Sequence, residues 1–269
     1  MKTLKLTTIT KGYLRVAIDN GPMNLFDQEM CDDLSQLVTS LEQNEDVKVV
    51  IFESANPDFF LAHLDVARAG QMNMEPQPAT GLSQWPDIAY RLERAPFLTV
   101  GLLRGRARAV GSEFLQALDV RFASKEKAII SQIEIGCGLV PGGGGLERLP
   151  SLIGRSRTLE VVLGGDDFDA DTAERYGLIN RAIPDAALDA FVDNFARRVD
   201  SFDREATKLA KELINERSGL PTIENLAATQ VKFFDAFGKP AAQARIGELF
   251  KRGLQQREFE LDLAKNIIL

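Results

Sequence analysis

The sequence predicts an α/β fold followed by a helical region, and three observations support this prediction. Strand-like, helix-like and strand-like segments alternate near the start of the chain, which is typical of an α/β layered core. From residue 185 onward the pattern becomes wholly helical. The 269 residues are 45% hydrophobic and 26% charged, as in an ordinary globular protein that can bury a large core.

The first half of the chain alternates short apolar runs with one long amphipathic segment. Lys11-Gly12 separates two strand-like runs, which is a hairpin signal. The amphipathic segment carries its apolar side chains on a single stripe, as a helix packed on a core does. We predict strands over residues 4–10, 13–19, 47–52 and 97–103, and helices over 27–43 and 111–118.

The second half is predicted to be mainly helical. A helix should begin near Leu146 and break at Gly154, and a shorter helix should end at Gly177. The composition changes near Ser201, so we predict a core over residues 1–200 and a helical region over residues 201–269. The other predicted elements are a strand over 178–183 and helices over 169–176, 185–199, 204–216, 223–237 and 241–254.

The composition argues against several classes of partner. With a net charge of -7 and a pI of about 5.0, the chain is not expected to bind nucleic acid or an anionic membrane. No apolar run reaches membrane-spanning length, and the start lacks the apolar core of a signal peptide. Cys31 and Cys137 are too few for a disulfide framework, so we expect a reduced, cytoplasmic setting. His63 is the only histidine, and no metal site is expected.

The stretch from Arg104 to Pro150 contains two glutamates in positions that suit catalysis. Glu113 lies at the start of a predicted helix, where free backbone N–H groups and the helix dipole can stabilise an oxyanion. Glu134 lies among isoleucines, and burial there should raise the pKa of its carboxyl group. The two carboxylates can converge if the second segment folds back across the first.

The glycine run from Pro141 to Gly145 has two readings. A phosphate-binding loop would need a Lys followed by Ser or Thr, and neither closes this run. We therefore expect the glycines to let the backbone turn tightly into the next helix.

Four segments in a fixed order resemble the crotonase family, the enoyl-CoA hydratase/isomerase superfamily. They are FFLAHLD at 59–65, GSEFLQALDVRFAS at 111–124, IEIGCGLVPGGGG at 133–145 and ERYGLINRAIP at 174–184. The resemblance extends over nearly the whole chain. It implies a crotonase-like ββα spiral core and a C-terminal helical region that packs subunits into a homotrimer or a dimer of trimers.

The resemblance also implies roles for individual residues. The N–H groups of Leu64 and Val110 match the oxyanion hole that holds a thioester carbonyl, and Glu113 and Glu134 match the two glutamates of the family's hydratases. Coenzyme A is then part of an acyl-CoA substrate, and no separate cofactor is expected. The residues expected to bind this substrate are Met23, Leu25, Ala62, His63, Asp65, Gly111, Leu139 and Pro141.

The chain departs from the family pattern at two places. It has His63 where the family usually has glycine, and Ala109-Val110-Gly111 where the family has a glycine triplet. His63 has two readings, a donor to a substrate group or CoA phosphate, and a polar residue that tolerates a turn; we favour the second. The basic run Arg104, Arg106 and Arg108 could bind a CoA phosphate, although a solvated loop face is the preferred reading.

The activity expected from these residues is reversible hydration of an enoyl-CoA thioester. The alternatives are double-bond isomerisation or hydroxyacyl-CoA dehydration on the same scaffold, and a catalytically silent acyl-CoA-binding protein. We expect Cys137 to be a small packing residue and Asp119 to be structural. Residues 71–81 are expected to form a loop that lines the acyl tunnel.

Overall fold

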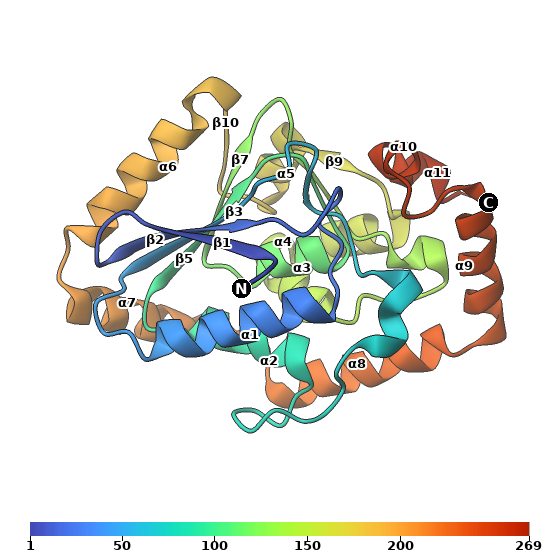
Figure 1. Cartoon of the computed structure of the whole chain (residues 1–269), viewed down its shortest axis with the longest axis horizontal. Coiled ribbons are helices and arrows are strands. Elements are labelled where there is room, and N and C mark those ends of the chain that lie inside the picture. The colour runs from blue at the N-terminus through green and yellow to red at the C-terminus, as the bar shows by residue number, and fades with distance from the viewer. Residues whose placement is uncertain (269) are drawn as a thin grey trace.

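Two β-sheets form the centre of the fold in the computed structural model, which describes residues 1–268 (Figure 1). The larger sheet has the order β1-β2-β3-β5-β7-β10 and the smaller one has the order β4-β6-β8-β9. The strands are β1 Leu4–Thr8, β2 Tyr13–Ile18, β3 Val49–Ser54, β4 Phe59–Leu61, β5 Leu98–Leu103, β6 Arg106–Arg108, β7 Val120–Ser124, β8 Ile129–Ser131, β9 Phe168–Asp169 and β10 Arg181–Ile183.

Helices cover both faces of the larger sheet (Figure 1). α6 packs Leu188 and Val192 on one face, and α1 packs Met30 and Leu34 on the other. The central strands β3 and β5 are consequently buried on both sides, which explains their continuous apolar runs. The predicted hairpin is confirmed, because β1 and β2 pair antiparallel around Lys11-Gly12.

The helices follow the sequence prediction closely over most of the chain. α4 has non-helical backbone angles at Gly154, where the break was predicted, and α5 ends at Gly177. The helices are α1 Gln28–Glu42, α2 Gln84–Arg94, α3 Val110–Gln116, α4 Gly145–Gly164, α5 Ala170–Tyr176, α6 Asp185–Asp200, α7 Arg204–Arg217, α8 Ile223–Phe237, α9 Pro240–Arg252, α10 Arg257–Leu261 and α11 Leu263–Asn266, with 3₁₀ helices η1 Val66–Gln71 and η2 Glu134–Cys137.

The smaller sheet brings three predicted site segments together. Strands β4, β6 and β8 run parallel, so their carboxyl ends meet at one edge of the sheet. Leu64 follows β4, Val110 follows β6 and Glu134 follows β8. The fold therefore places both expected oxyanion donors and one glutamate at the same edge.

The helical region after residue 200 packs against this edge instead of standing apart from the core. Ile246 and Leu249 of α9 share one hydrophobic cluster with Ile133 and Leu139 beside η2. Figure 1 shows α9, α10 and α11 together at the right of the molecule. The predicted division near Ser201 falls between two helices, α6 and α7, and the predicted role of residues 201–269 in subunit packing stays a prediction.

Candidate active site

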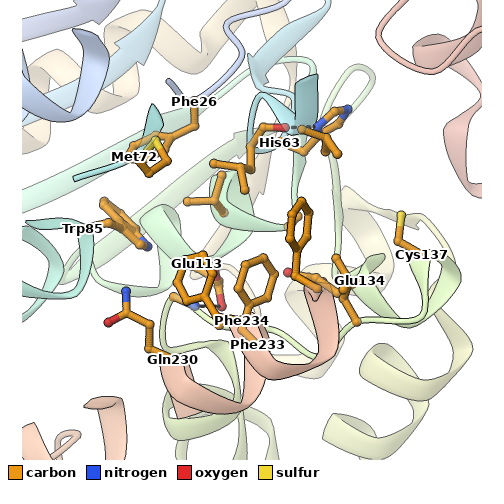
Figure 2. Close-up of a pocket in the computed structure, with 18 of the residues that line it drawn as sticks. Phe26, His63, Met72, Trp85, Glu113, Glu134, Cys137, Gln230, Phe233 and Phe234 are labelled. Carbon is orange, nitrogen blue, oxygen red and sulfur yellow. Dashed lines mark hydrogen bonds between the residues drawn. The ribbon is translucent and has the colours of Figure 1, made fainter. Parts of the chain in front are cut away.

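A mainly apolar cavity of about 110 Å³ lies at the carboxyl edge of the smaller sheet. Glu113 and Glu134 both line it, together with Leu64 and Val110. Figure 2 shows the two glutamates reaching the cavity from different segments, with Phe233 and Phe234 of α8 beside them. The aromatic part of the wall consists of Phe26, Trp85, Phe233, Phe234 and Phe237.

Glu113 is held by the glycine run. It lies in the first turn of α3, at the start of a helix as predicted, and only 2% of it is exposed. Its Oε1 accepts hydrogen bonds from the N–H groups of Gly143 at 2.8 Å and Gly145 at 2.9 Å. Burial raises the pKa of Glu113 to about 7, although these two amides and the charge of Arg148 act in the opposite direction.

Gly143 has no room for a side chain. A Cβ at this position would lie 2.3 Å from Glu113 Oε2 and 2.3 Å from Trp85 Nε1. The glycine run therefore does more than turn the chain, as the sequence predicted, because its backbone also packs directly against a carboxylate. The run binds an anion as a phosphate loop would, but that anion is a side chain of the same protein.

Glu134 begins η2 and is also buried. Its carboxylate accepts hydrogen bonds from Nε2 of Gln132 at 3.1 and 3.3 Å, and Gln132 in turn accepts one from Gln116 at 3.1 Å. Burial, followed by the charge of Glu113, raises the pKa of Glu134 well above its ordinary value. Both carboxyl groups line one cavity, so the predicted convergence of the two segments is confirmed.

The N–H groups of Leu64 and Val110 are free to bind a ligand. Neither donates a hydrogen bond to any acceptor within residues 1–268, and both residues line the cavity. The peptide that carries the Leu64 N–H is fixed by a bond of 2.8 Å from the Phe26 N–H to the His63 carbonyl oxygen. Two free N–H groups beside one cavity are the arrangement of an oxyanion hole.

Ala109 adopts a strained conformation that aims the Val110 N–H. Its φ of 49° and ψ of -121° lie in a region that glycine adopts far more readily. The alanine methyl group lines the cavity. The departure from the family's glycine triplet thus keeps the backbone geometry at a cost in strain and adds a side chain to the wall.

The other residues expected to bind substrate divide into two groups. His63 and Leu139 line the cavity. The remainder lie outside the wall of this cavity, and their role in substrate binding stays a prediction: Met23, Leu25, Ala62, Asp65, Gly111 and Pro141. Met72 and Met74 of the predicted lining loop do line it, as does Cys137, which is buried as a packing residue would be.

The favoured reading of His63, as a polar residue that tolerates a turn, was wrong. His63 does not serve a turn: its ring is buried, Nδ1 lies 2.7 Å from the Leu64 carbonyl oxygen and Nε2 lies 3.1 Å from Oε1 of Glu260. The favoured reading failed because Glu260 is distant in sequence and only the fold brings it near.

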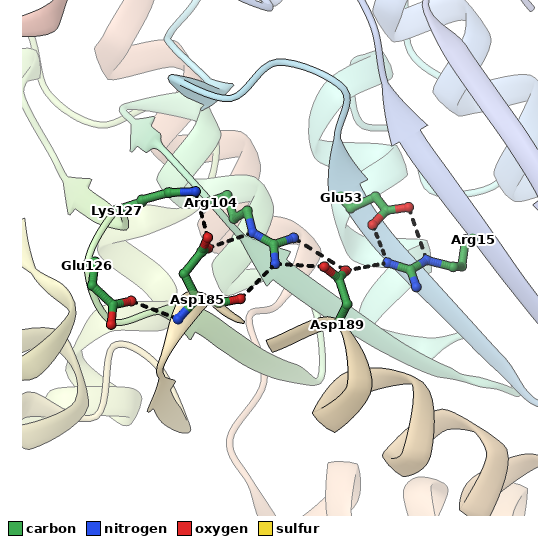
Figure 3. A network of polar contacts seen from close by, with 7 residues as sticks. All are labelled: Arg15, Glu53, Arg104, Glu126, Lys127, Asp185 and Asp189. Carbon is green, nitrogen blue, oxygen red and sulfur yellow. Dashed lines mark hydrogen bonds and ion pairs between the residues drawn. The ribbon is translucent and has the colours of Figure 1, made fainter. Parts of the chain in front are cut away.

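The arginine run is neither a solvated loop face nor a free phosphate site. Arg104 pairs with Asp185 and Asp189 in a network that joins β5 to α6 (Figure 3). Arg106 donates to the Leu261 carbonyl oxygen, and Arg108 is fully buried. All three guanidinium groups are used inside the fold, where sequence proximity alone could not place their partners.

Several wall residues had no signal in the sequence. Phe233 and Phe234 come from α8, and Trp85 comes from α2, a helix that the sequence analysis did not assign. Trp85 is 8% exposed, and its Nε1 has no hydrogen-bond partner within residues 1–268. Aromatic residues on a helix indicate only a buried face, so their part in this cavity required the structure.

Comparisons with known proteins find relatives over most of the chain. A model of the "Enoyl-CoA hydratase/isomerase" family matches residues 8–255. A Dictyostelium discoideum protein named "Probable enoyl-CoA hydratase, mitochondrial" is 27% identical over 235 residues, which is 86% of this chain and 83% of that protein. "Fatty acid oxidation complex subunit alpha" of Aliivibrio fischeri is 27% identical over 187 residues, 69% of this chain but only 27% of that longer protein.

Solved structures confirm the predicted crotonase fold. The crystal structure of "a putative enoyl-CoA hydratase" from Streptomyces avermitilis superposes with a TM-score of 0.95 at 42% identity, covering 99% of this chain and 96% of the other. An "Enoyl-CoA Hydratase from Bacillus anthracis" gives a TM-score of 0.74 at 23% identity, over 93% of this chain and 96% of the other, which is a likeness of fold alone.

Proposed function

The chain belongs to the enoyl-CoA hydratase/isomerase family, and we propose that it is a hydratase-type lyase that adds water reversibly to the α,β double bond of an acyl-CoA thioester. The observation that carries this proposal is the convergence of Glu113 and Glu134 on one cavity, with the pKa of each raised by burial. Hydration requires one group to take a proton and another to give one, and the pair supplies both.

The proposed reaction begins with water held between the two carboxyl groups. Glu113, whose carboxylate is stabilised by two backbone amides, takes a proton from water while the water oxygen bonds to the β-carbon. The electron pair of the double bond moves to the thioester oxygen. The N–H groups of Leu64 and Val110 stabilise the negative charge that develops there.

The second half of the reaction completes the addition. Protonated Glu134 gives its proton to the α-carbon, the thioester carbonyl re-forms, and one water has been added. A proton transfer from Glu113 to Glu134 then restores the starting state. Because the charge of one carboxylate affects the other, the pair titrates as a unit.

Isomerisation is the alternative on the same site. Moving a double bond needs one group that takes a proton from one carbon and returns it to another, so a single carboxylate suffices. The two buried glutamates favour hydration, and the reverse reaction, dehydration of a hydroxyacyl-CoA, follows from the same groups. A silent binding protein would have no use for a carboxylate with a pKa of about 7 inside an apolar cavity.

The remaining features of the proposal concern assembly and setting. We propose a homotrimer or a dimer of trimers, supported by apolar side chains that α4 and α7 leave exposed, among them Leu163, Leu209 and Ile214. We propose that the reaction needs no cofactor besides the coenzyme A of the substrate, and that the protein is cytoplasmic. Within residues 1–268, no helix is long and apolar enough to cross a membrane.

Turnover in ¹⁸O-labelled water tests the proposed function. Short, long and aromatic enoyl-CoA thioesters are each incubated with the protein and analysed by mass spectrometry. We expect one of them to give a hydroxyacyl-CoA that carries the label. A shifted double bond without label would instead support isomerisation, and no change in any thioester that binds would support the silent binding protein.

A further inference from the structure

Glu260 of α10 contacts both arms of the proposed oxyanion hole. One arm is the His63-Leu64 segment after β4, and the other is the segment from Arg108, at the end of β6, to Val110. The Glu260 side chain approaches the first arm, since its Oε1 lies 3.1 Å from Nε2 of His63. Its backbone carbonyl oxygen accepts a hydrogen bond of 2.5 Å from Nη1 of Arg108 on the second arm.

The contact with His63 reaches the peptide chain that carries the first donor. His63 Nδ1 lies 2.7 Å from the Leu64 carbonyl oxygen, so the imidazole bridges Glu260 and the residue whose N–H faces the cavity. Burial alone would lower the pKa of His63, but the charge of Glu260 and the Leu64 carbonyl outweigh burial and raise it. Nδ1 is within hydrogen-bond distance of the Leu64 carbonyl oxygen, while Nε2 lies in ion-pair range of Glu260 without a hydrogen bond to any group within residues 1–268.

The second arm is anchored just as firmly. Arg108 is fully buried, and its Nε and Nη2 donate to Asp167 at 2.8 and 2.6 Å. Arg106 of the same strand donates to the Leu261 carbonyl oxygen at 2.8 Å. Two successive residues of α10 thus accept hydrogen bonds from alternate residues of β6.

Glu260 itself is fixed from its own side. It is fully buried, and its Oε1 also accepts the Gln255 N–H at 2.8 Å. Gln255 reaches the first arm as well, through its side chain, which donates to Asp65 Oδ1 at 2.9 Å and accepts from the Ala67 N–H at 3.0 Å. A buried carboxylate is costly unless it has partners, and the contacts with His63 and the Gln255 N–H offset that cost.

We propose that Glu260 is a positioning residue that sets the separation of the Leu64 and Val110 N–H groups. This inference rests on the proposed function, because it assumes that the two N–H groups hold a thioester oxygen. A glycine at position 63 has no side chain that could contact Glu260, so the proposed positioning depends on His63. The helical region after residue 200 would then contribute to catalysis within its own chain.

The test compares Glu260→Gln with Glu258→Gln, a control that removes an exposed carboxylate from the same helix. We measure kcat, KM and the infrared carbonyl band of a bound ¹³C-labelled thioester. Misplacement of an oxyanion donor should lower kcat by about 10- to 100-fold and leave KM within about threefold. The carbonyl band, shifted by polarisation in the unaltered protein, should return toward its position in water, while the control changes nothing.

A double variant distinguishes a loss of positioning from a general loss of folding. Glu260→Gln removes the charge that faces the buried imidazole of His63, whereas His63→Gln/Glu260→Gln removes the imidazole as well. If Glu260 acts through His63, the double variant should lose no more kcat than the worse single variant. Losses that multiply, or an unshifted kcat and carbonyl band in a folded Glu260→Gln variant, would overturn the inference.

The infrared measurement distinguishes a failure of this inference from a failure of the proposed function. If the unaltered protein hydrates no thioester, the proposed function fails, but a band shift that Glu260→Gln abolishes still supports the positioning role. If no shift occurs on binding to the unaltered protein, there is no oxyanion hole to position and the inference fails with it.

Discussion

The two buried carboxyl groups of the cavity, Glu113 and Glu134, differ in their hydrogen-bond partners, and this difference affects their chemistry. Glu113 is almost fully buried but receives two backbone N–H bonds, whereas Glu134 is buried with only an amide side chain for support. Burial raises the pKa of both carboxyl groups, to about 7 for Glu113, and the charge of Glu113 raises that of Glu134 as well. A pair coupled in this way resists carrying two negative charges, so with one proton bound it can both take and give a proton.

The pH dependence of the rate should follow from these environments. Because Glu113 must be ionised to take a proton, kcat/KM should rise as pH increases through about 7. Because Glu134 must be protonated, the rate should fall again at higher pH. A profile of kcat/KM against pH checks this, and a rate that is flat between pH 5 and about 8 would contradict it.

The raised pKa of Glu113 should also make the stability of the protein depend on pH, and Glu113→Gln is the variant that tests this. Since the folded-state pKa of Glu113 lies above its ordinary value of 4.5, its contribution to stability is complete below that value and is lost as pH rises through about 7. The unaltered protein should therefore lose up to about 3 kcal/mol of unfolding free energy over this range from this group. Glu113→Gln should lack that loss when unfolding is measured in urea at several pH values.

Gly143 should be intolerant of even a methyl group. In Gly143→Ala the new Cβ would lie 2.3 Å from Glu113 Oε2, so the carboxylate or the glycine run must move. We expect kcat to fall by about 10²-fold, as misplacement of a catalytic group does. Gly164→Ala is the matched control, because nothing lies within 4 Å of a Cβ built there. Full activity of Gly143→Ala would show that the amide contact is dispensable.

Helix α7 contacts the core through an ion pair between Lys211 and Asp119, which lies outside the candidate active site. Lys211 of α7 donates to Asp119 Oδ2 at 2.7 Å, and the same carboxylate accepts the N–H and hydroxyl of Thr99 at 2.7 and 2.9 Å. Asp119→Asn should lower the unfolding free energy by about 2–3 kcal/mol, since a largely buried lysine loses its partner.

The rate separates this structural acid from the catalytic pair. Asp119→Asn should keep kcat within about twofold, whereas general acid–base groups contribute factors of about 10² or more. Glu212→Gln, which alters an exposed acid of α7, should change neither stability nor rate. A large loss of kcat in folded Asp119→Asn would mean that α7 takes part in the reaction.

The sequence predicted long elements better than short ones. Helices α6 to α9 were predicted within a few residues because each has a long periodic pattern and clear ends. The strands β6 and β8 have three residues each and carry no periodicity, so they were not predicted. Helix α2 was also missed, because Pro86 suggests a break in a helix, although the first turn, where it lies, tolerates proline.

The candidate site was predicted only where its residues lie near a recognisable motif. Glu113, Glu134, Leu64 and Val110 all line one cavity, as the resemblance implied. Glu260 could not be assigned, because its partners come from segments some two hundred residues earlier in the chain, and a lone glutamate in a C-terminal helix reads as a surface charge. Long-range pairing of buried charges is a property of the fold that no local pattern reports.

In the whole molecule, the region after residue 200 helps to form the site. Its α8 supplies Phe233 and Phe234 to the cavity wall, and its α10 supplies Glu260 behind the oxyanion hole. The cavity is therefore built from both sides of the predicted division at residues 200 and 201. Removal of the last helices should consequently affect the site as well as any subunit contact.

The central claim is that Glu113 and Glu134 together add water to an enoyl thioester. The most direct measurement is the rate of ¹⁸O and α-carbon deuterium incorporation from doubly labelled water by the unaltered protein, Glu113→Gln, Glu134→Gln and the Glu212→Gln control. We expect both labels to enter with the unaltered protein and the control, and each catalytic variant to lose both by about 10²-fold or more. Full incorporation by either Glu113→Gln or Glu134→Gln would contradict the two-carboxylate mechanism.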